Sequence, residues 1–225
     1  MALIDDLIQR GWLKTPRIIE AFRKIKRVDF LPEDIKNLAE LNEALPIGYG
    51  QTISQPLVVA FMLESLDPQP GEKILDIGSG SGWTTALLAH IVSQEGNPKS
   101  QIPNPKQIPN PKFQNSKGKI IAIEIIPELV EFGKHNVAKY NFIEKRIVEF
   151  VCVDGSKGYE KEAPFDKILA SASARELPSA WRKQLKVGGK IVTPIGSSIW
   201  LISKKSEKEF EETEFPGFAF VPLIT

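Results

Sequence analysis

The stretch Lys73–Ile91, KILDIGSGSGWTTALLAHI, decides the fold of this chain. It opens with an apolar run typical of a buried strand, and after its glycines the apolar residues follow a helical period. Asp76 ends the strand, and the turn contains Gly78, Gly80 and Gly82. Glycines permit a tight turn, and the N-terminus of the next helix offers unpaired N–H groups to a ligand. The stretch therefore predicts a strand–loop–helix unit of the nucleotide-binding type.

The spacing of the glycines narrows the choice of ligand. The pattern is G-x-G-x-G, whereas NAD and FAD favour G-x-G-x-x-G, and no Lys-Ser or Lys-Thr follows, which excludes a P-loop. An acid that binds ribose hydroxyls is expected at the end of the next strand, about 20 residues further on. Glu124 ends the predicted strand Lys119–Glu124, but it lies much further along the chain.

An insertion accounts for this extra distance. QIPNPK occurs twice in tandem, at 101–106 and 107–112, and prolines spaced so closely do not belong in a helix or a central strand. Without residues 96–117, Glu124 lies at the expected distance from the glycine loop. We expect 96–117 to be a disordered insertion, and its lysines leave open a contact with an acidic partner.

The rest of the chain repeats the alternation of strands and helices. Helices are predicted within 3–44 and at 56–66, 127–140 and from Pro178, and further strands at 147–154, 165–170, 189–196 and 198–204. The sequence thus predicts an α/β fold, a Rossmann-like doubly wound and mostly parallel sheet, with an antiparallel edge hairpin and an N-terminal helical extension. We expect a single domain over 1–225, with a helical segment and active-site loop in 1–55 and the core in 56–225.

Composition sets broad limits on function. The 225 residues carry a formal net charge of +1, with 42% apolar and 25% charged residues, which gives no bulk argument for binding nucleic acid or a membrane. Cys152 is the single cysteine, so an internal disulfide and a cysteine-based metal cluster are excluded. The N-terminal residues do not have the pattern of a signal peptide. We expect a cytoplasmic monomer without a metal.

The acidic residues after the strands indicate the cofactor. Glu124 is the expected ribose ligand, and Asp154-Gly155 follows the third predicted strand, where an acceptor for an adenine amino group would lie. Asp-Gly is also a common turn pair, so a purely structural turn is the alternative. Together with Asp76, these positions favour S-adenosyl-L-methionine over a dinucleotide.

Three longer motifs carry a family resemblance. They are IGYGQTISQP at 47–56, DGSKGYEKEAPFDKIL at 154–169 and QLKVGGKIVTPIG at 184–196. With them, and apart from the insertion, the chain resembles the protein-L-isoaspartate O-methyltransferases over nearly its whole length. The resemblance implies methyl esterification of the side carboxylate of L-isoaspartyl residues in damaged proteins and peptides. S-adenosyl-L-methionine would be the donor and S-adenosyl-L-homocysteine the product, and the ester would start repair through a succinimide.

Ser54 has two interpretations. From its place before Gln55-Pro56 it is a candidate N-cap of helix 56–66. The resemblance instead implies that it is the catalytic residue, which orients the isoaspartyl carboxylate. Matching positions imply roles for further residues. The substrate would contact Thr52, Ile53, Ser171, Ala172 and Ser173, and the cofactor would contact Asp76, Gly78, Ser79, Gly80, Ser81, Gly82, Glu124, Ile125, Asp154 and Gly155.

The chain departs from the family pattern at four positions. Arg175 stands where many relatives have proline, Glu40 where an aromatic is common, Val59 where some have histidine, and Ile224 where some have threonine. These departures bear on substrate preference. Two alternatives are therefore kept: a carboxylate methyltransferase acting on an aspartate of a dedicated partner protein, and an inactive cofactor-binding module.

Overall fold

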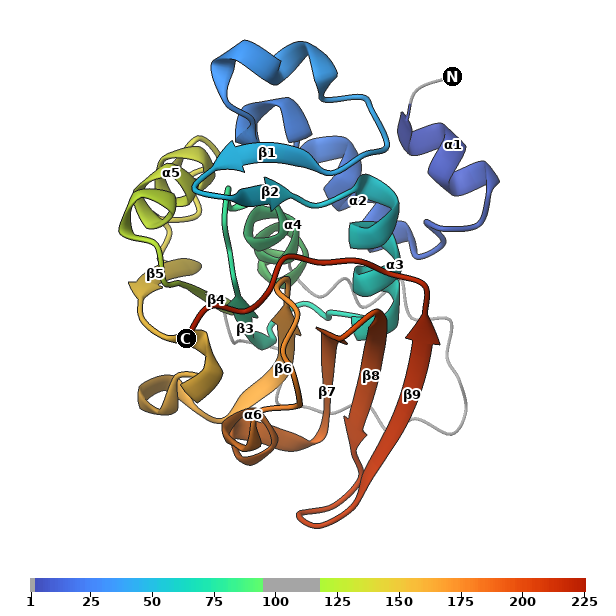
Figure 1. The fold of residues 1–225 in the computed structure, drawn as a ribbon, viewed down its shortest axis with the longest axis vertical. Helices are drawn as coiled ribbons and strands as arrows, with labels where there is room; N and C mark the ends of the chain where they lie inside the picture. The colour runs from blue at the N-terminus through green and yellow to red at the C-terminus, as the bar shows by residue number, and fades with distance from the viewer. Residues whose placement is uncertain (1–2, 95–117) are drawn as a thin grey trace.

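The computed structural model describes residues 3–94 and 118–225 and has a seven-stranded sheet at its centre (Figure 1). The strand order is β5-β4-β3-β6-β7-β8-β9; β5 to β7 run parallel, and β8 and β9 are antiparallel additions. The strands are β3 Lys73–Ile77, β4 Lys119–Glu124, β5 Val148–Cys152, β6 Phe165–Ala170, β7 Leu185–Ile195, β8 Ser198–Lys204 and β9 Phe210–Pro216. The expected α/β fold with a mostly parallel sheet is confirmed.

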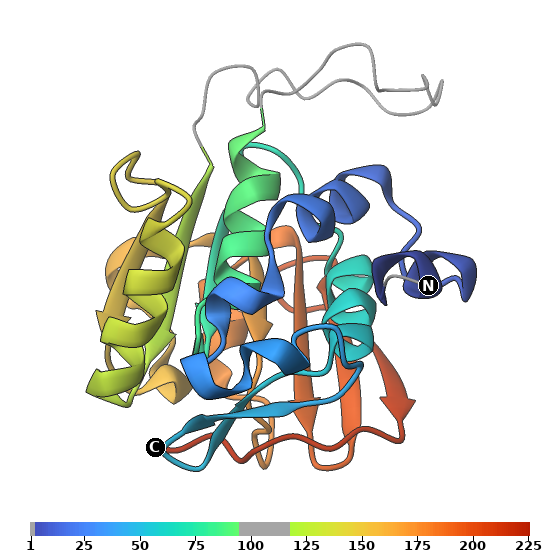
Figure 2. The same ribbon diagram turned by 90° about the horizontal axis from the view of Figure 1, so that it is seen from above.

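Helices cover both faces of the sheet, as expected. One face carries a large core with α1 Leu3–Gln9, α2 Pro16–Lys24, α3 Pro56–Leu66, α4 Trp83–Ser93 and α5 Pro127–Ala138, most of which Figure 2 shows on one side of the strands. The other face carries α6 Ser179–Gln184 and the short 3₁₀ helices η4 Gly155–Lys157 and η5 Glu160–Glu162. Within β3, Ile74 belongs to the first core and Leu75 to the second, which explains the continuous apolar runs of the central strands.

Two parts of the chain differ from the sequence prediction. The predicted helical stretch 3–44 breaks after α2 into two 3₁₀ helices, η1 Arg27–Phe30 and η2 Glu33–Leu38, and an unpredicted hairpin of β1 Leu45–Gly48 and β2 Gln51–Ile53 follows. Its turn contains three residues with positive φ, Gly48 at 91°, Tyr49 at 55° and Gly50 at 71°. Strand β9 was also not predicted, because its charged, mostly exposed sequence lacks an apolar run.

The topology creates a crevice beside β3. This strand pairs with β4 on one side and β6 on the other, so the chain changes direction between them. In open α/β sheets, ligands bind at the carboxyl ends of the strands at such a switch point. Figure 1 shows the β1–β2 hairpin and the C-terminal segment 217–225 crossing over this edge of the sheet.

Two expectations concern parts or properties outside this architecture. The insertion predicted at 96–117 lies outside the described residues. In the described part of the chain, no helix is long and apolar enough to cross a membrane.

Candidate active site

A cavity of about 370 Å³ lies at the carboxyl ends of the central strands. Its walls come from the loops after four parallel strands, at Gly78–Ser81, Glu124–Ile126, Gly155 and Ser171–Ala172. The hairpin and the residues after it contribute Gln51–Gln55, and the C-terminal segment contributes Ala219–Ile224. Three regions that are far apart in the sequence therefore enclose one site.

The glycine loop is held to the end of β4 by its own amides. The N–H groups of Gly78 and Ser79 donate to the Ile123 carbonyl at 2.9 and 3.0 Å. The Gly80 N–H donates to Glu124 Oε2 at 3.0 Å. Both glycines have positive φ, 74° and 50°, which side chains rarely adopt. These amides fix the shape of the loop.

Gly82 serves packing. A Cβ at this position would lie 2.8 Å from the Gly133 carbonyl oxygen of α5, so only glycine permits the observed approach of loop and helix. Gly82 is buried and does not line the cavity. Gly82 therefore allows the glycine loop to approach the backbone of α5 closely.

Glu124 lines the cavity and also joins two loops. Its carboxylate accepts the Ile125 N–H at 2.8 Å and the Ile126 N–H at 3.1 Å, besides the Gly80 N–H. An ionised carboxylate has about four acceptor positions, so three backbone donors leave room for a ligand hydroxyl. The structural role was not foreseen from the sequence, and the ribose role stays a prediction.

Asp76 lies beneath the loop, outside the cavity lining. It is fully buried, and Thr85 Oγ1 donates to its Oδ2 at 2.5 Å. Its Oδ1 has no hydrogen-bond partner among the described residues. Burial raises the pKa of Asp76 to about 7; the Thr85 hydrogen bond opposes the rise, and the charge of Glu124 adds to it.

Asp154 forms a turn at the rim of the site. Its Oδ1 accepts the Ser156 N–H at 2.9 Å and so caps η4. Partial burial raises its pKa, but the hydrogen bonds from Ser156 and the charge of Lys157 outweigh this effect and leave the pKa below its usual value. Gly155 lines the cavity, whereas Asp154 does not. The turn is confirmed, and the adenine contact of Asp154 stays a prediction.

Ser54 is not the N-cap of α3. The N-cap is Gln55, and the Leu57 N–H donates to Asn42 Oδ1 at 3.0 Å, so a distant side chain caps the helix. Ser54 lies one position earlier, after the end of β2, because the hairpin carries the extended chain up to the helix. The cap interpretation is therefore wrong. The Ser54 side chain is half-buried on the cavity wall, and no residue of the described chain hydrogen-bonds its hydroxyl.

The residues of the small-residue loop after β6, Ser171–Ala174, have two different roles. Ser171 and Ala172 line the cavity, close to Gly78. Ser173 instead pairs with the C-terminal segment: its N–H donates to the Val221 carbonyl at 2.8 Å, and the Leu223 N–H donates to its carbonyl at 2.9 Å. The loop thus positions the last residues of the chain over the site.

Sequence reasoning missed several lining residues, among them Val58, Trp83 and most of 219–224. Two buried polar atoms at the cavity, Ser79 Oγ and Trp83 Nε1, have no partner among the described residues. The available signal for the C-terminal segment was the apolar sequence FVPL at 220–223, all four residues of which line the cavity.

The four departures lie in different surroundings. Arg175 and Glu40 are exposed, and Glu40 accepts the Leu3 N–H at 3.4 Å. Val59 is buried in the core and does not line the cavity. Ile224 is 44% exposed and lines the cavity, so it is the departure placed to contact a ligand.

Comparison with known proteins shows the family of the chain. The family model for protein-L-isoaspartate(D-aspartate) O-methyltransferases matches residues 1–225. The chain belongs to this family. It is 38% identical over 226 residues to the protein-L-isoaspartate O-methyltransferase of Methanopyrus kandleri, covering 99% of this chain and 89% of that one. It is 40% identical to the Staphylothermus marinus enzyme, again over 226 residues, covering 99% and 92%.

A solved structure shares the fold. A Plasmodium falciparum chain described as a protein-L-isoaspartate O-methyltransferase, in complex with S-adenosyl-L-homocysteine, matches with a TM-score of 0.79 at 24% identity. The match covers 99% of this chain and 96% of that one. The family and fold expected from the sequence are confirmed. Membership makes the chain an O-methyltransferase of isoaspartyl residues that uses S-adenosylmethionine.

Proposed function

We propose that methyl transfer to the isoaspartyl side carboxylate takes place in the cavity beneath the β1–β2 hairpin, where Ser54 orients the carboxylate. The observation that carries this proposal is that Ser54 lines the cavity and that its hydroxyl has no hydrogen-bond partner among the described residues. A hydroxyl so placed is free to donate to an incoming carboxylate oxygen. Thr52, Ile53, Ser171 and Ala172 complete the surrounding wall.

The chemistry requires little catalytic apparatus. A side-chain carboxylate with a pKa near 4 is ionised at neutral pH, so no general base is needed. S-adenosylmethionine supplies a methyl group on a positively charged sulfur. The protein must hold the carboxylate in line at about 3–3.5 Å and exclude water. The hairpin and the C-terminal segment cover the cavity and perform the second task.

The residues of the cavity suit the cofactor. Ser79 Oγ and Trp83 Nε1 are buried polar atoms that a zwitterionic amino-acid group or its bound water would satisfy. We assign the methionine portion to the glycine loop, including Ser81, the ribose to Glu124 and Ile125, and the adenine to the neighbourhood of Gly155. These three sets of protein residues lie at the ends of three different parallel strands, so the ligand would lie across the carboxyl edge of the sheet.

The biological proposal is repair of damaged proteins by a cytoplasmic monomer. Small residues at Ser171 and Ala172 would let a substrate backbone approach closely. A net charge of +1 favours no class of charged partner. Methylation would turn the isoaspartyl carboxylate into a better leaving group, and closure to a succinimide would follow.

A matched pair of peptides tests the proposal. Labelled S-adenosylmethionine is supplied with two peptides that differ only in one isoaspartyl or aspartyl linkage. Base-labile label on the isoaspartyl peptide alone is the expected result. Equal labelling of both peptides would contradict recognition of the isoaspartyl linkage. Label on neither peptide, with the cofactor bound, would favour a dedicated partner substrate or an inactive module.

A further inference from the structure

The guanidinium of Arg27 is buried in a cage of backbone carbonyls. Arg27 begins η1 and is 6% exposed. Its Nη1 donates to the carbonyls of Ala39 and Leu41 at 3.2 and 2.9 Å, and its Nη2 donates to those of Glu43 and Ser54 at 2.7 and 3.3 Å. Both Nη atoms therefore have all their hydrogens engaged. No carboxylate of the described chain forms an ion pair with this group.

These carbonyls mark both ends of the β1–β2 hairpin. Glu43 lies just before β1, and Ser54 directly follows β2. One planar group thus joins the chain entering the hairpin to the chain leaving it. A rigid guanidinium fork can hold several acceptors in one plane, which a single ammonium group cannot do.

Contacts with α5 and α4 fix the position of Arg27 and of η1. In the same 3₁₀ helix, Asp29 Oδ2 accepts the Tyr140 hydroxyl at 2.6 Å, and the Asp29 carbonyl accepts Lys139 Nζ at 2.7 Å, at the end of α5. The guanidinium lies over the ring of Trp83, 5.4 Å from its centroid. Trp83 begins α4 and lines the cavity. Arg27 therefore connects the hairpin base to the helices that carry the cofactor loop.

We propose that Arg27 is a positioning residue for methyl transfer, which clamps the base of the β1–β2 hairpin and so fixes the Ser54 hydroxyl over the cavity. The inference rests on the proposed role of Ser54. Arg27 acts through the Ser54 backbone, because Arg27 does not itself line the cavity. A displacement of about 1 Å at a reacting group costs about 100-fold in rate.

The charge of Arg27 is maintained at neutral pH. Burial lowers its pKa to about 10, and the nearby charge of Glu40 opposes the decrease. Four of its five N–H hydrogens, those on the two Nη atoms, have carbonyl acceptors that fix the orientation of the group, and its Nε is buried without a partner among the described residues.

The test is Arg27→Lys, with Arg17→Lys as the matched control. Arg17 also anchors the N-terminal extension, through Asp67 and the Pro68 carbonyl, but it does so at the far end of α3. For Arg27→Lys we expect kcat on the isoaspartyl peptide to fall about 100-fold. The dissociation constant of S-adenosylmethionine should change by less than about threefold, and Arg17→Lys should leave kcat within about twofold. Parallel losses of kcat and cofactor affinity in Arg27→Lys would overturn the proposal.

Hydrogen exchange supplies a readout that does not depend on activity. Amides of β1 and β2 should exchange about 10-fold faster in Arg27→Lys than in the wild type, and at unchanged rates in Arg17→Lys. Unchanged protection of the hairpin would contradict the clamp even if kcat fell. If Arg27→Lys does not fold, native-state exchange of the wild type decides: the hairpin should open together with η1, and independent opening would refute the clamp.

Different results would refute the proposed function and the proposed role of Arg27. A wild-type enzyme that leaves the isoaspartyl peptide unlabelled would refute the proposed function. The exchange behaviour of the hairpin would still decide whether Arg27 clamps it.

Discussion

At the scale of single residues, Ser54 combines a position on the cavity wall with a hydroxyl that has no partner in the described chain. Because α3 is capped by Asn42, removing this hydroxyl costs no helix cap. We expect Ser54→Ala to lower kcat for isoaspartyl peptide by about 10²–10³-fold, the range found when one orienting donor is removed. Cofactor affinity, measured by equilibrium titration, should stay close to that of the wild type.

Ser65→Ala is the matched control for this prediction. Ser65 lies near the other end of α3, and its hydroxyl donates to the Phe61 carbonyl at 2.8 Å. The same change of side chain should leave kcat unaltered there. Equal losses of turnover and cofactor affinity in Ser54→Ala would assign the residue a merely structural role.

Asp76 gives a prediction on pH. Its folded-state pKa of about 7 lies above its ordinary value of 3.8, so between these pH values the folded protein holds a proton that the unfolded chain has released. The stabilisation is complete below the unfolded pKa and is lost as pH rises towards 7. We expect the free energy of unfolding of the ligand-free enzyme to fall in this window by up to about 1.4 kcal/mol per pH unit from this group.

The variant Asp76→Asn isolates that contribution. It cannot ionise, so its difference from the wild type in urea unfolding should shift steadily in favour of the variant between about pH 4 and 7. Glu72, whose pKa burial raises to about 7 despite the opposing charge of Lys167, titrates in both proteins and cancels in the difference. A difference that does not vary with pH would show that Asp76 is ionised in the folded state.

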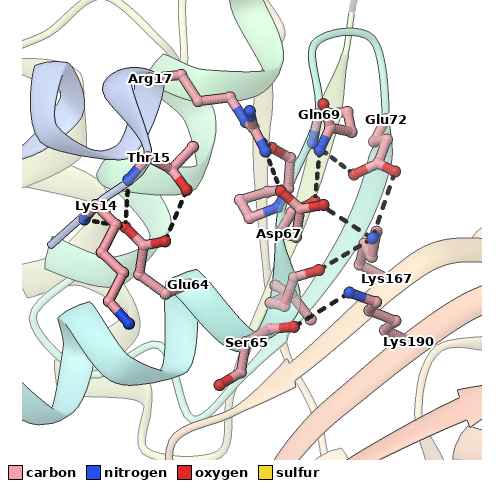
Figure 3. Close-up of polar contacts among 12 residues, drawn as sticks. Lys14, Thr15, Arg17, Glu64, Ser65, Asp67, Gln69, Glu72, Lys167 and Lys190 are labelled. Atoms are coloured by element: carbon pink, nitrogen blue, oxygen red, sulfur yellow. Dashed lines mark hydrogen bonds and ion pairs between the residues drawn. The ribbon is translucent and has the colours of Figure 1, made fainter. Parts of the chain in front are cut away.

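At the scale of elements, lysines from the sheet anchor the C-terminus of α3 (Figure 3). Lys167 Nζ donates to the carbonyls of Leu66 and Asp67 at 3.0 and 3.3 Å and lies 3.8 Å from Glu72 Oε1. A cation there satisfies carbonyls that the helix leaves free and complements its dipole. The opposite end of the same helix follows Ser54, so this anchor contributes to the geometry of the site.

Lys167→Met should therefore destabilise the fold. It leaves two carbonyls and Glu72 without their cation, and we expect a loss of about 2–4 kcal/mol in urea unfolding at neutral pH. Lys190→Met is the control, because Lys190 Nζ makes a single, longer bond of 3.4 Å to the Ser65 carbonyl. It should lose about 1 kcal/mol or less. Equal losses from the two variants would show that the buried lysine has no special role.

The elements that the sequence predicted well share one physical cause. The bounds of α3, β4 and β6 agree with the prediction, because each is buried along its whole apolar run or face and is limited by a proline, glycine or acid. The β1–β2 hairpin was missed because its strands have only four and three residues, and β9 was missed because polar and charged residues fill its centre. β1 pairs with β2 and β9 pairs with β8, and the charges of β9 suit an exposed edge.

At the scale of the whole molecule, the cavity is formed by several segments of the chain, and the sequence patterns predicted some of them but not others. Loops after β3, β4 and β6 were placed correctly, because parallel strands bring their carboxyl ends to one edge. Ser54 entered only through the family resemblance, and its local pattern suggested a cap. Arg27 gave no sequence signal, because its four carbonyl partners come together only after the hairpin has folded over α4.

The chain leaves and re-enters the described fold at one place. Gly118 lies against the end of α4, where a Cβ would be 2.4 Å from the Val92 carbonyl oxygen. Because Gly118 lies beside Val92, joining residue 95 to Gly118 should preserve α4 and β4. This deletion tests whether the segment is an insertion, as the sequence predicts.

We expect the deletion variant to keep kcat/KM for the isoaspartyl peptide within about twofold, because Gly118, where the described chain resumes, lies at the amino end of β4, opposite the cavity. Its free energy of unfolding should rise by about 1–2 kcal/mol, since closing a shorter connection costs less entropy. Peptide methylation and urea unfolding measure the two quantities. A matched variant that keeps the length but replaces the lysines with serine separates composition from length. Loss of activity in both variants, with stability retained, would show that the basic segment takes part in substrate binding.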